Sequence, residues 1–326
     1  MNWLEKRWYT PSLLVWLLWP ISLLYRLVSH YRRQKLKKAW KNQPPLPVPV
    51  IIVGNLSVGG NGKTPLVIRL VKLLRQHGYH PGVLSRGYGG NTAYPASVSV
   101  SSVAAEVGDE PVLMRQHVQC PIVVDPNRVR GGEYLIEHHG CDLILCDDGL
   151  QHYRLQRDIE MVVMDGQRRL GNGHLLPMGP LREGAWRLNT VDFIIVNGGK
   201  TQKGEYLMGL ESGRLVNVKH PAQTLSVSAL KEPVTAIAAI GNPQRFFRAL
   251  QSKQITLKDC IAFSDHHMFS AEDIPEGIVV MTEKDAVKCR EFADENWWYL
   301  PVSATLSAEF EQQFLAKVKE VKNGIR

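Results

Sequence analysis

The sequence predicts an α/β fold whose main domain is a mostly parallel sheet with helices on both faces. Short apolar runs rich in valine and isoleucine alternate with amphipathic segments from Val50 to Asn197, which is the pattern of repeated βα units. A glycine-rich loop ending in Gly-Lys-Thr follows the first run, and acidic residues follow two later runs. Parallel strands present their carboxyl ends at one edge of a sheet, so these residues are expected to gather there.

Length and composition allow a second, smaller α/β domain. The chain has 326 residues, of which 44% are apolar and 21% are charged, as in a folded globular protein. A polar stretch begins near Gly198, and three further runs of strand character follow it. We expect a membrane-associating helix with a linker over 1–45, a nucleotide-binding core over 46–200, a connecting ribbon over 201–225 and the smaller domain over 226–326.

Cysteine and charge content exclude several classes of protein. The five cysteines are odd in number and include no C-x-x-C pair, which argues against a disulfide framework or a zinc site and favours a reducing compartment. The net charge is +8, but residues 1–45 hold nine Lys and Arg against Glu5 alone, so the rest of the chain is neutral. We therefore expect no nucleic-acid partner, and no obligate protein partner is evident.

The N-terminal segment has the character of a membrane-associating helix. No charged residue lies between Trp8 and Tyr25, a length that just reaches the span of a bilayer, and Pro20 is expected to kink it. Aromatic residues flank the segment, and a basic cluster over 26–41 is suited to anionic headgroups on the cytoplasmic side. A buried core helix is the alternative. A proline-rich, extended linker over 43–49 leads into the first strand.

The strand Val50 to Val53 and the loop after it predict a phosphate-binding site of the P-loop NTPase-like kind. Glycines let backbone N–H groups converge on phosphate oxygens, Lys63 can reach the β- and γ-phosphates, and Thr64 can ligate Mg²⁺. Ser57 stands where the standard pattern has its first glycine. A turn that merely joins strand to helix is the alternative. The residues expected to bind the nucleotide are Asn55, Ser57, Val58, Gly59, Gly60, Asn61, Gly62, Lys63 and Thr64.

Two further loops carry charged residues whose role the local sequence leaves open. Arg86 lies in a glycine-rich loop after a short strand, where it could contact a phosphorylated ligand or form a simple turn. Asp109 and Glu110 precede a helix expected to begin at Pro111. Acidic residues at such a position are either functional or simply match the helix dipole.

The second strong feature is an apolar strand over 142–146 that ends in Asp147 and Asp148. This is the Walker B arrangement, which brings a carboxylate beside the metal bound at a phosphate loop. Gln151 follows at the same end of the strand. A long Gly/Pro-rich loop over 171–183 and the Asp265-His266-His267 cluster complete the candidates. Paired histidines more often pack or cap than catalyse, so that cluster stays open at this point.

The ordered set of these motifs closely resembles the tetraacyldisaccharide 4′-kinase family of lipid A biosynthesis. Leu150, where an aromatic residue is expected, is a mild departure. The matching blocks are Val53-Gly54-Asn55, Gly59 to Pro65, Ser85 to Gly89, Val107 to Pro111, Asp147 to His152, Leu176 to Glu183, Asp265-His266-His267 and Thr282 to Ala286.

The resemblance implies transfer of the ATP γ-phosphate to the 4′-hydroxyl of a membrane-embedded tetraacylated disaccharide 1-phosphate, giving lipid IVA. It implies that Asp109 is the base for the sugar hydroxyl, with His266 as its partner and Glu110 close by. Such a site would close between two domains around ATP and lipid.

The resemblance also implies roles for the remaining charged residues. Lys63 and Thr64 would hold phosphate and Mg²⁺, with Asp147 on the metal side. Substrate contacts would come from Asp148, Gln151, Arg86 and Arg182. The enzyme would work at the cytoplasmic face of the inner membrane, because four acyl chains hold its substrate there.

Two rival classes remain. A ParA/MinD-like ATPase switch would need a signature lysine where this chain has Val58, and a GTP-dependent metallochaperone would need a Cys/His cluster that the sequence does not show.

Overall fold

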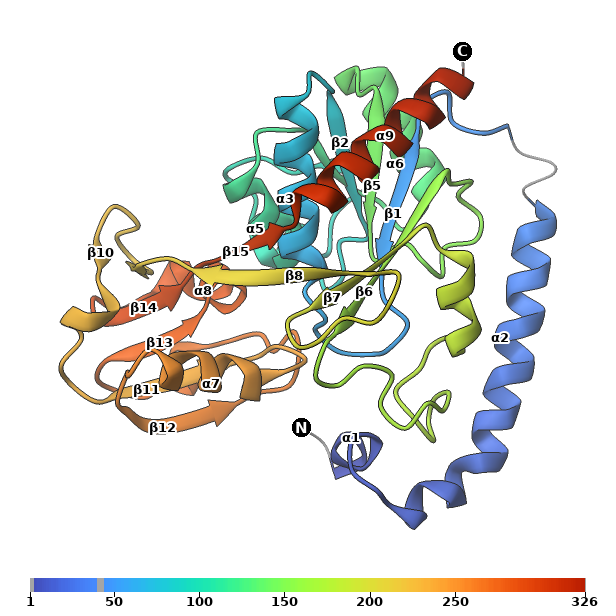
Figure 1. Cartoon of the computed structure of the whole chain (residues 1–326). Helices are drawn as coiled ribbons and strands as arrows, with labels where there is room; N and C mark the ends of the chain where they lie inside the picture. The colour runs from blue at the N-terminus through green and yellow to red at the C-terminus, as the bar shows by residue number, and fades with distance from the viewer. Residues whose placement is uncertain (1–2, 40–43, 326) are drawn as a thin grey trace.

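The computed structural model describes residues 3–39 and 44–325 and arranges them around two sheets (Figure 1). Part of the expected linker, together with Trp40 and Lys41 of the N-terminal flank, lies outside the described residues. The helices are α1 (Trp3–Trp8), α2 (Trp19–Ala39), α3 (Lys63–Gln76), α4 (Ala104–Val107), α5 (Asp109–His117), α6 (Arg128–His139), α7 (Pro243–Ser252), α8 (Glu283–Cys289) and α9 (Ala308–Gly324).

The larger sheet is mostly parallel and runs in the order β15-β8-β7-β6-β1-β5-β2-β4-β3. Only its two outermost pairs, β15 with β8 and β3 with β4, are antiparallel among the described strands. Its strands are β1 (Val50–Gly54), β2 (Pro81–Ser85), β3 (Ala96–Ser97), β4 (Ile122–Val124), β5 (Leu143–Asp147), β6 (Ile159–Asp165), β7 (Phe193–Asn197), β8 (Glu205–Ser212) and β15 (Val302–Leu306).

Helices cover both faces of this sheet, as the sequence predicts. Because side chains alternate along a strand, Ile51 and Val53 of β1 pack into the cluster that α3 and α9 cover, whereas Ile52 packs into the cluster that α6 covers. Leu70 of α3 is fully buried in the first cluster. Both faces of β1 are thus buried, which explains its continuous apolar run.

The smaller sheet lies beside the carboxyl edge of the larger one (Figure 1) and runs in the order β10-β9-β14-β13-β11-β12. Its strands are β9 (Leu215–Asn217), β10 (Thr224–Leu225), β11 (Val234–Ala238), β12 (Leu257–Ala262), β13 (Val279–Thr282) and β14 (Trp297–Leu300).

The chain crosses between the sheets differently from the expected boundaries. The range 201–225 supplies β8 to the larger sheet and β9 and β10 to the smaller one, rather than forming only a ribbon. After β14 the chain returns: β15 pairs with β8, and Phe310 and Phe314 of α9 are buried on the larger sheet. Local pattern does not show this return, because an apolar helix face fits either core. The boundaries of independently folding units stay a prediction.

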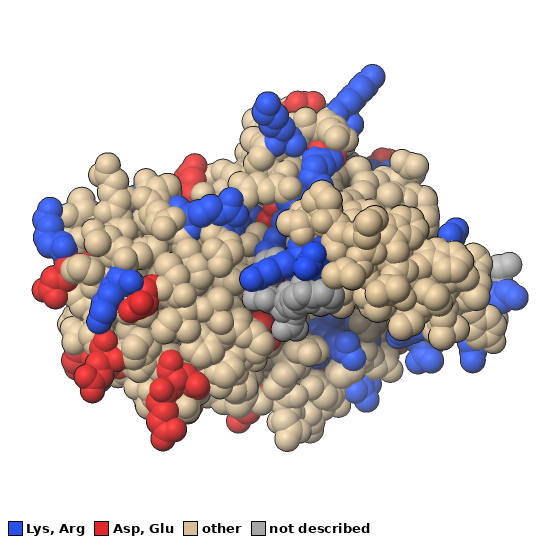
Figure 2. Space-filling view, turned by 90° about the horizontal axis from the view of Figure 1, so that it is seen from below, with Lys and Arg blue, Asp and Glu red and all other residues tan. Residues whose placement is uncertain are grey.

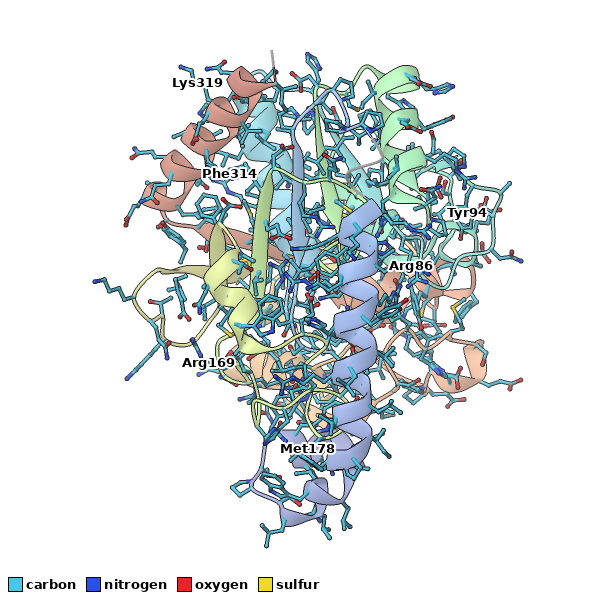
Figure 3. All side chains as sticks on the ribbon, turned by 90° about the vertical axis from the view of Figure 1, so that its right-hand side faces the viewer. Arg86, Tyr94, Arg169, Met178, Phe314 and Lys319 are labelled. Atoms are coloured by element: carbon cyan, nitrogen blue, oxygen red, sulfur yellow. The ribbon has the colours of Figure 1, made fainter. Side chains whose placement is uncertain are left out.

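The N-terminal arm stands along one side of the molecule, where α2 runs as a single long helix (Figures 1 and 3). A 3₁₀ segment, Leu13–Leu18, leads directly into α2, so Pro20 lies in the first turn, where it loses no helical hydrogen bond and produces no break. Leu13 and Leu17 are 86% and 77% exposed. This exposure contradicts the core-helix alternative for the segment.

The range Leu13–Lys38 is long and apolar enough to cross a membrane, and 11% of its most apolar stretch is buried. Figure 2 shows the end of the molecule that carries this segment as a broad surface without charge, with Lys and Arg around its edge. Three hydrogen bonds tie the arm to the 171–183 loop: Trp8 Nε1 to the Pro177 carbonyl, Ser22 Oγ to the Leu175 carbonyl, and the Tyr25 hydroxyl to the Arg182 carbonyl. Met178 of that loop lies behind the lower half of α2 in Figure 3.

Candidate active site

The phosphate loop joins β1 to α3 as predicted, and its shape is held from beneath. Gly62 has φ +93°, and a Cβ there would come within 2.2 Å of Asn197 Nδ2, so this position requires glycine. Asn197 Nδ2 in turn donates to the Asn61 carbonyl at 2.9 Å. Ser57, the departure from the usual pattern, accepts a hydrogen bond from Asn61 Nδ2 at 3.1 Å. The serine therefore braces the loop from within.

Asn55 and Ser57 lie under the loop, whereas the other predicted loop residues face a cavity. Asn55 is fully buried and donates to the Gly59 carbonyl at 3.3 Å. The cavity has a volume of about 1040 Å³ and extends from the phosphate loop to the side of α2. The predicted residues that line it are Val58, Gly59, Gly60, Asn61, Gly62, Lys63, Thr64, Arg86, Asp109, Glu110, Asp147, Asp148, Gln151, Arg182 and His266.

Asp147 is positioned beside the phosphate loop by strand pairing. Val53 of β1 pairs with Asp147 of β5, so the carboxylate ends its strand next to the start of the loop. Asp147 is 1% exposed, and within the described part of the chain neither carboxylate oxygen has a hydrogen-bond donor. Burial and the nearby charge of Glu110 raise its pKa to about 7. An orphaned buried carboxylate of this kind fits a bound cation.

Asp148 instead pairs with the cations of the site. Its carboxylate lies 3.4 Å from Lys63 Nζ and 3.2 Å from an Arg182 guanidinium nitrogen. Burial alone would raise the pKa of Asp148, but the charges of Lys63 and Arg182 outweigh it and hold that pKa well below its usual range. The ion pair with Asp148 holds Lys63 at the cavity wall, where its ammonium could bind a phosphate instead.

Asp109 and His266 meet across the two sheets. Asp109 lies in the first turn of α5, which begins two residues before the expected start at Pro111, because a proline early in the first turn needs no donor. His266 comes from the loop after β12, and its Nδ1 lies 3.0 Å from Asp109 Oδ2 and 3.2 Å from Oδ1. The Tyr88 ring packs against the imidazole at a centroid distance of 4.9 Å. The histidine is thus a partner of the aspartate.

The same contact shifts the pKa of both partners. Burial opposes the charge of Asp109, but the hydrogen bond from His266 and the nearby Lys284 ammonium outweigh it and lower its pKa. Burial also opposes the charge of His266, and the hydrogen bond to Asp109 outweighs it and raises that pKa. Asp109 is 6% exposed, so the two groups form a largely desolvated pair at the cavity wall.

Sequence reasoning missed three residues of the site. The Lys284 ammonium lies among Asp109, Glu110 and His266. Lys284 follows the carboxyl end of β13, and this position could have marked it as a candidate because ligands bind at the carboxyl ends of parallel strands. Arg128 is 3% exposed, lines the cavity and donates to the Asp147 carbonyl at 3.0 Å, with no signal beyond its place after β4. Gly241 packs against the phosphate loop from the smaller sheet.

A phosphate loop, a buried carboxylate after the neighbouring strand and an aspartate–histidine pair in one cavity define a P-loop kinase, which transfers phosphate to a second substrate. The family can be named more closely. The chain belongs to the tetraacyldisaccharide-1-P 4′-kinase family, whose model matches residues 14–319. Members of this family are ATP-dependent kinases of lipid A biosynthesis.

Individual relatives agree over nearly the whole chain. A tetraacyldisaccharide 4′-kinase of Pseudoalteromonas atlantica is 57% identical over 304 residues, covering 93% of this chain and 100% of that protein. One from Shewanella baltica is 50% identical over 325 residues, covering 97% and 95%. A crystal structure of "apo" form LpxK from Aquifex aeolicus in complex with ATP superposes with a TM-score of 0.77 at 30% identity, covering 94% of this chain and 100% of that one.

Proposed function

We propose that this chain transfers the γ-phosphate of ATP to the 4′-hydroxyl of a tetraacylated disaccharide 1-phosphate at the cytoplasmic face of the inner membrane, giving lipid IVA. One observation carries the residue assignment: the Asp109–His266 pair and the phosphate loop line one cavity that extends to α2. A hydroxyl that attacks phosphorus must lose its proton, and a P-loop ATPase switch has no need of a base for a second substrate.

Asp109 is the proposed base for the 4′-hydroxyl. His266 Nδ1 lies within hydrogen-bond distance of both carboxylate oxygens, and Oδ1 also accepts the backbone N–H of Glu110 at 2.8 Å. Because each carboxylate oxygen has two lone pairs, the group can still accept the incoming proton. Glu110 is the next residue on the same helical turn and contributes negative charge beside the pair. Lys63 stabilises the negative charge that develops on the γ-phosphate oxygens during transfer.

The nucleotide and its metal occupy the other side of the cavity in this proposal. Backbone N–H groups from Val58 to Thr64 cradle the phosphates, while Asn55 and Ser57 hold the loop in shape. Thr64 and Asp147 would hold Mg²⁺, and the orphaned oxygens of Asp147 fit that use. When bound, the ion neutralises phosphate charge. The described residues hold no cluster of three or more His, Cys, Asp or Glu suited to a metal. Mg²⁺ beside a nucleotide commonly takes only one or two protein ligands together with phosphate and water.

The lipid substrate is proposed to enter from the side of α2. Tyr25 and Arg32 of α2 line the same cavity as Arg86, Gln151 and Arg182, so the wall nearest the arm is polar and basic. A disaccharide phosphate matches this wall, and its acyl chains match the exposed apolar residues of the arm. The basic residues at the end of α2 favour the cytoplasmic leaflet.

The test is transfer of radiolabelled γ-phosphate from ATP to tetraacyldisaccharide 1-phosphate in detergent micelles. Wild type should give a labelled bisphosphate lipid, and Asp109→Asn should lose about two to four orders of magnitude in kcat, the usual contribution of a general base. Release of labelled inorganic phosphate without lipid product would favour the ATPase switch. Wild-type activity in Asp109→Asn would remove the case for this base.

A further inference from the structure

An arginine of α7, a helix that packs on the smaller sheet, reaches the ends of two strands of the larger sheet. Strand pairing places Asp165 and Asn197 side by side at the carboxyl ends of β6 and β7. The Arg245 guanidinium donates a hydrogen bond to Asn197 Oδ1, and its Nη1 lies 3.6 Å from Asp165 Oδ2. Asp165 and Asn197 are 3% and 2% exposed, so Arg245 makes these contacts with buried groups.

The same asparagine holds the phosphate loop. Asn197 Nδ2 donates to the carbonyl of Asn61, a loop residue that is 4% exposed, at 2.9 Å. Because a trans peptide is planar, a fixed Asn61 carbonyl also fixes the N–H of Gly62, which points to the opposite side of that peptide. A phosphate loop binds its ligand through backbone N–H groups, so the orientation of this peptide affects nucleotide binding.

Donor and acceptor chemistry favours a single orientation of the Asn197 amide. Arginine carries donors and no acceptor, whereas a backbone carbonyl oxygen is only an acceptor. With Oδ1 toward Arg245 and Nδ2 toward Asn61, the amide satisfies both neighbours. The flipped amide would place N–H against N–H and oxygen against oxygen. Arg245 therefore stabilises the orientation in which Asn197 can hold the loop.

The arginine itself lies in a fixed setting. Asp165 Oδ2 accepts a hydrogen bond from Asn242 Nδ2 at 3.2 Å, and Oδ1 accepts two backbone N–H groups of the turn after β6, each at 2.9 Å. The guanidinium thus lies beside a carboxylate that cannot easily move. Arg245 reaches Asn197 through its side chain, so this link is separate from the backbone contact that Gly241 makes with the phosphate loop.

We propose that Arg245 is a positioning residue that holds the Asn197 amide, and through it the peptide between Asn61 and Gly62, in the conformation that binds nucleotide. Nucleotide affinity then depends on a side chain from the smaller sheet, although the phosphate loop belongs to the larger one. This inference rests on the proposed binding of ATP phosphates by the loop, and it gives Arg245 no contact with the reacting atoms.

The experiment measures the dissociation constant of a fluorescent ATP analogue for wild type, Arg245→Met, Asn197→Ala and the double variant. Each single variant should bind the analogue about tenfold more weakly, the loss expected for one buried hydrogen bond. The double variant should bind no more weakly than Asn197→Ala, because Arg245 acts only through Asn197. Arg248→Met removes an exposed arginine of the same helix, and this matched control should leave the dissociation constant unchanged.

Hydrogen exchange of the phosphate-loop amides in the nucleotide-free protein gives a second readout that needs no Asn197 variant. Exchange should be faster in Arg245→Met than in wild type or Arg248→Met, because the loop loses its support. Additive losses of affinity in the double variant would mean that Arg245 binds the nucleotide itself or only adds positive charge. That result, or unchanged loop exchange in a folded Arg245→Met protein, would overturn the inference.

The inference and the proposed function fail in different ways. A wild-type protein that binds no ATP, or transfers no phosphate to the lipid, would remove the proposed function whatever Arg245 does. Wild-type transfer together with additive losses in the double variant would leave the proposed function intact and remove only the role of Arg245.

Discussion

Gly241 offers a direct test of whether the two halves of the cavity must meet for phosphate transfer. It lies in the turn between β11 and α7, and it packs against the tip of the phosphate loop. A Cβ at Gly241 would lie 2.1 Å from the Gly60 nitrogen and 2.6 Å from Gly59 Cα. Gly241 is not among the glycines with positive φ, so Gly241→Ala adds a steric clash without backbone strain.

The size of the effect follows from these distances. An ordinary van der Waals contact of a Cβ starts near 3.4 Å, so the 2.1 Å separation must open by about 1.3 Å. The contacting atoms are all backbone, which cannot rotate away. A misplacement of about 1 Å typically costs about a hundredfold in rate, or about 2.7 kcal/mol of transition-state stabilisation. Arg168 and Asn242, which tie this turn to the larger sheet at 2.8 and 3.2 Å, resist the opening and do not relieve it.

The assay is the micellar phosphate transfer described above, with ATP affinity measured separately by a fluorescent nucleotide. Gly241→Ala should lose about a hundredfold in kcat. ATP affinity should change much less, because the larger sheet itself braces the loop through Asn197. Gly324→Ala, at a glycine with no neighbour within 4 Å, is the control. A folded Gly241→Ala protein with kcat within about twofold of wild type would refute the idea that this close approach is needed for turnover.

The remaining predictions concern the arm, the metal and pH. Deleting residues 1–40 should lower transfer to lipid far more than ATP binding; equal losses in both would contradict a membrane role for the arm. Chelation with EDTA should abolish transfer and Mg²⁺ should restore it, whereas transfer that persists would exclude the proposed use of Thr64 and Asp147. Burial, with the charges of Arg128 and Arg86, lowers the pKa of His152 to about 4. The unfolded chain then binds more protons between about pH 6.5 and pH 4, so the free energy of unfolding should fall by up to about 3 kcal/mol as pH drops through that window. Urea titrations should show this fall, and His152→Gln should reduce it.

Local patterns sufficed for the larger sheet and the phosphate loop. A strand, a glycine-rich turn and a helix follow one another without interruption over 50–76, so their geometry is encoded in neighbouring residues. The apolar runs that became β5, β6 and β7 are buried on both faces, and such strands read as continuous hydrophobic segments. The apolar arm could also be predicted, because an uncharged run of this length is visible directly in the sequence, whereas its exposure was shown only by the structure.

Contacts between residues that are far apart in the sequence could not be predicted from local patterns. Asp109 and His266 are 157 residues apart, and each sits in a local context that also suits a helix cap or a packed ring. Only the family resemblance related them before the structure was considered. The return of β15 and α9 to the larger sheet was missed for the same reason. Helical periodicity predicts that Phe310 is buried, but it does not specify which of the two cores contains Phe310.

The sequence by itself therefore determined the class of fold, the phosphate loop, the apolar N-terminal arm and, through its ordered motifs, the family. The tertiary structure alone decided that Lys284 lies among Asp109, Glu110 and His266. It also decided that Gly241 packs against the phosphate loop and that the Tyr25 hydroxyl donates to the Arg182 carbonyl. Periodicity and motif spacing predict the local conformation of each residue and which face of its own helix or strand is buried. Contacts such as that between Gly241 and the phosphate loop arise only when the two sheets pack, and no local signal encodes that packing.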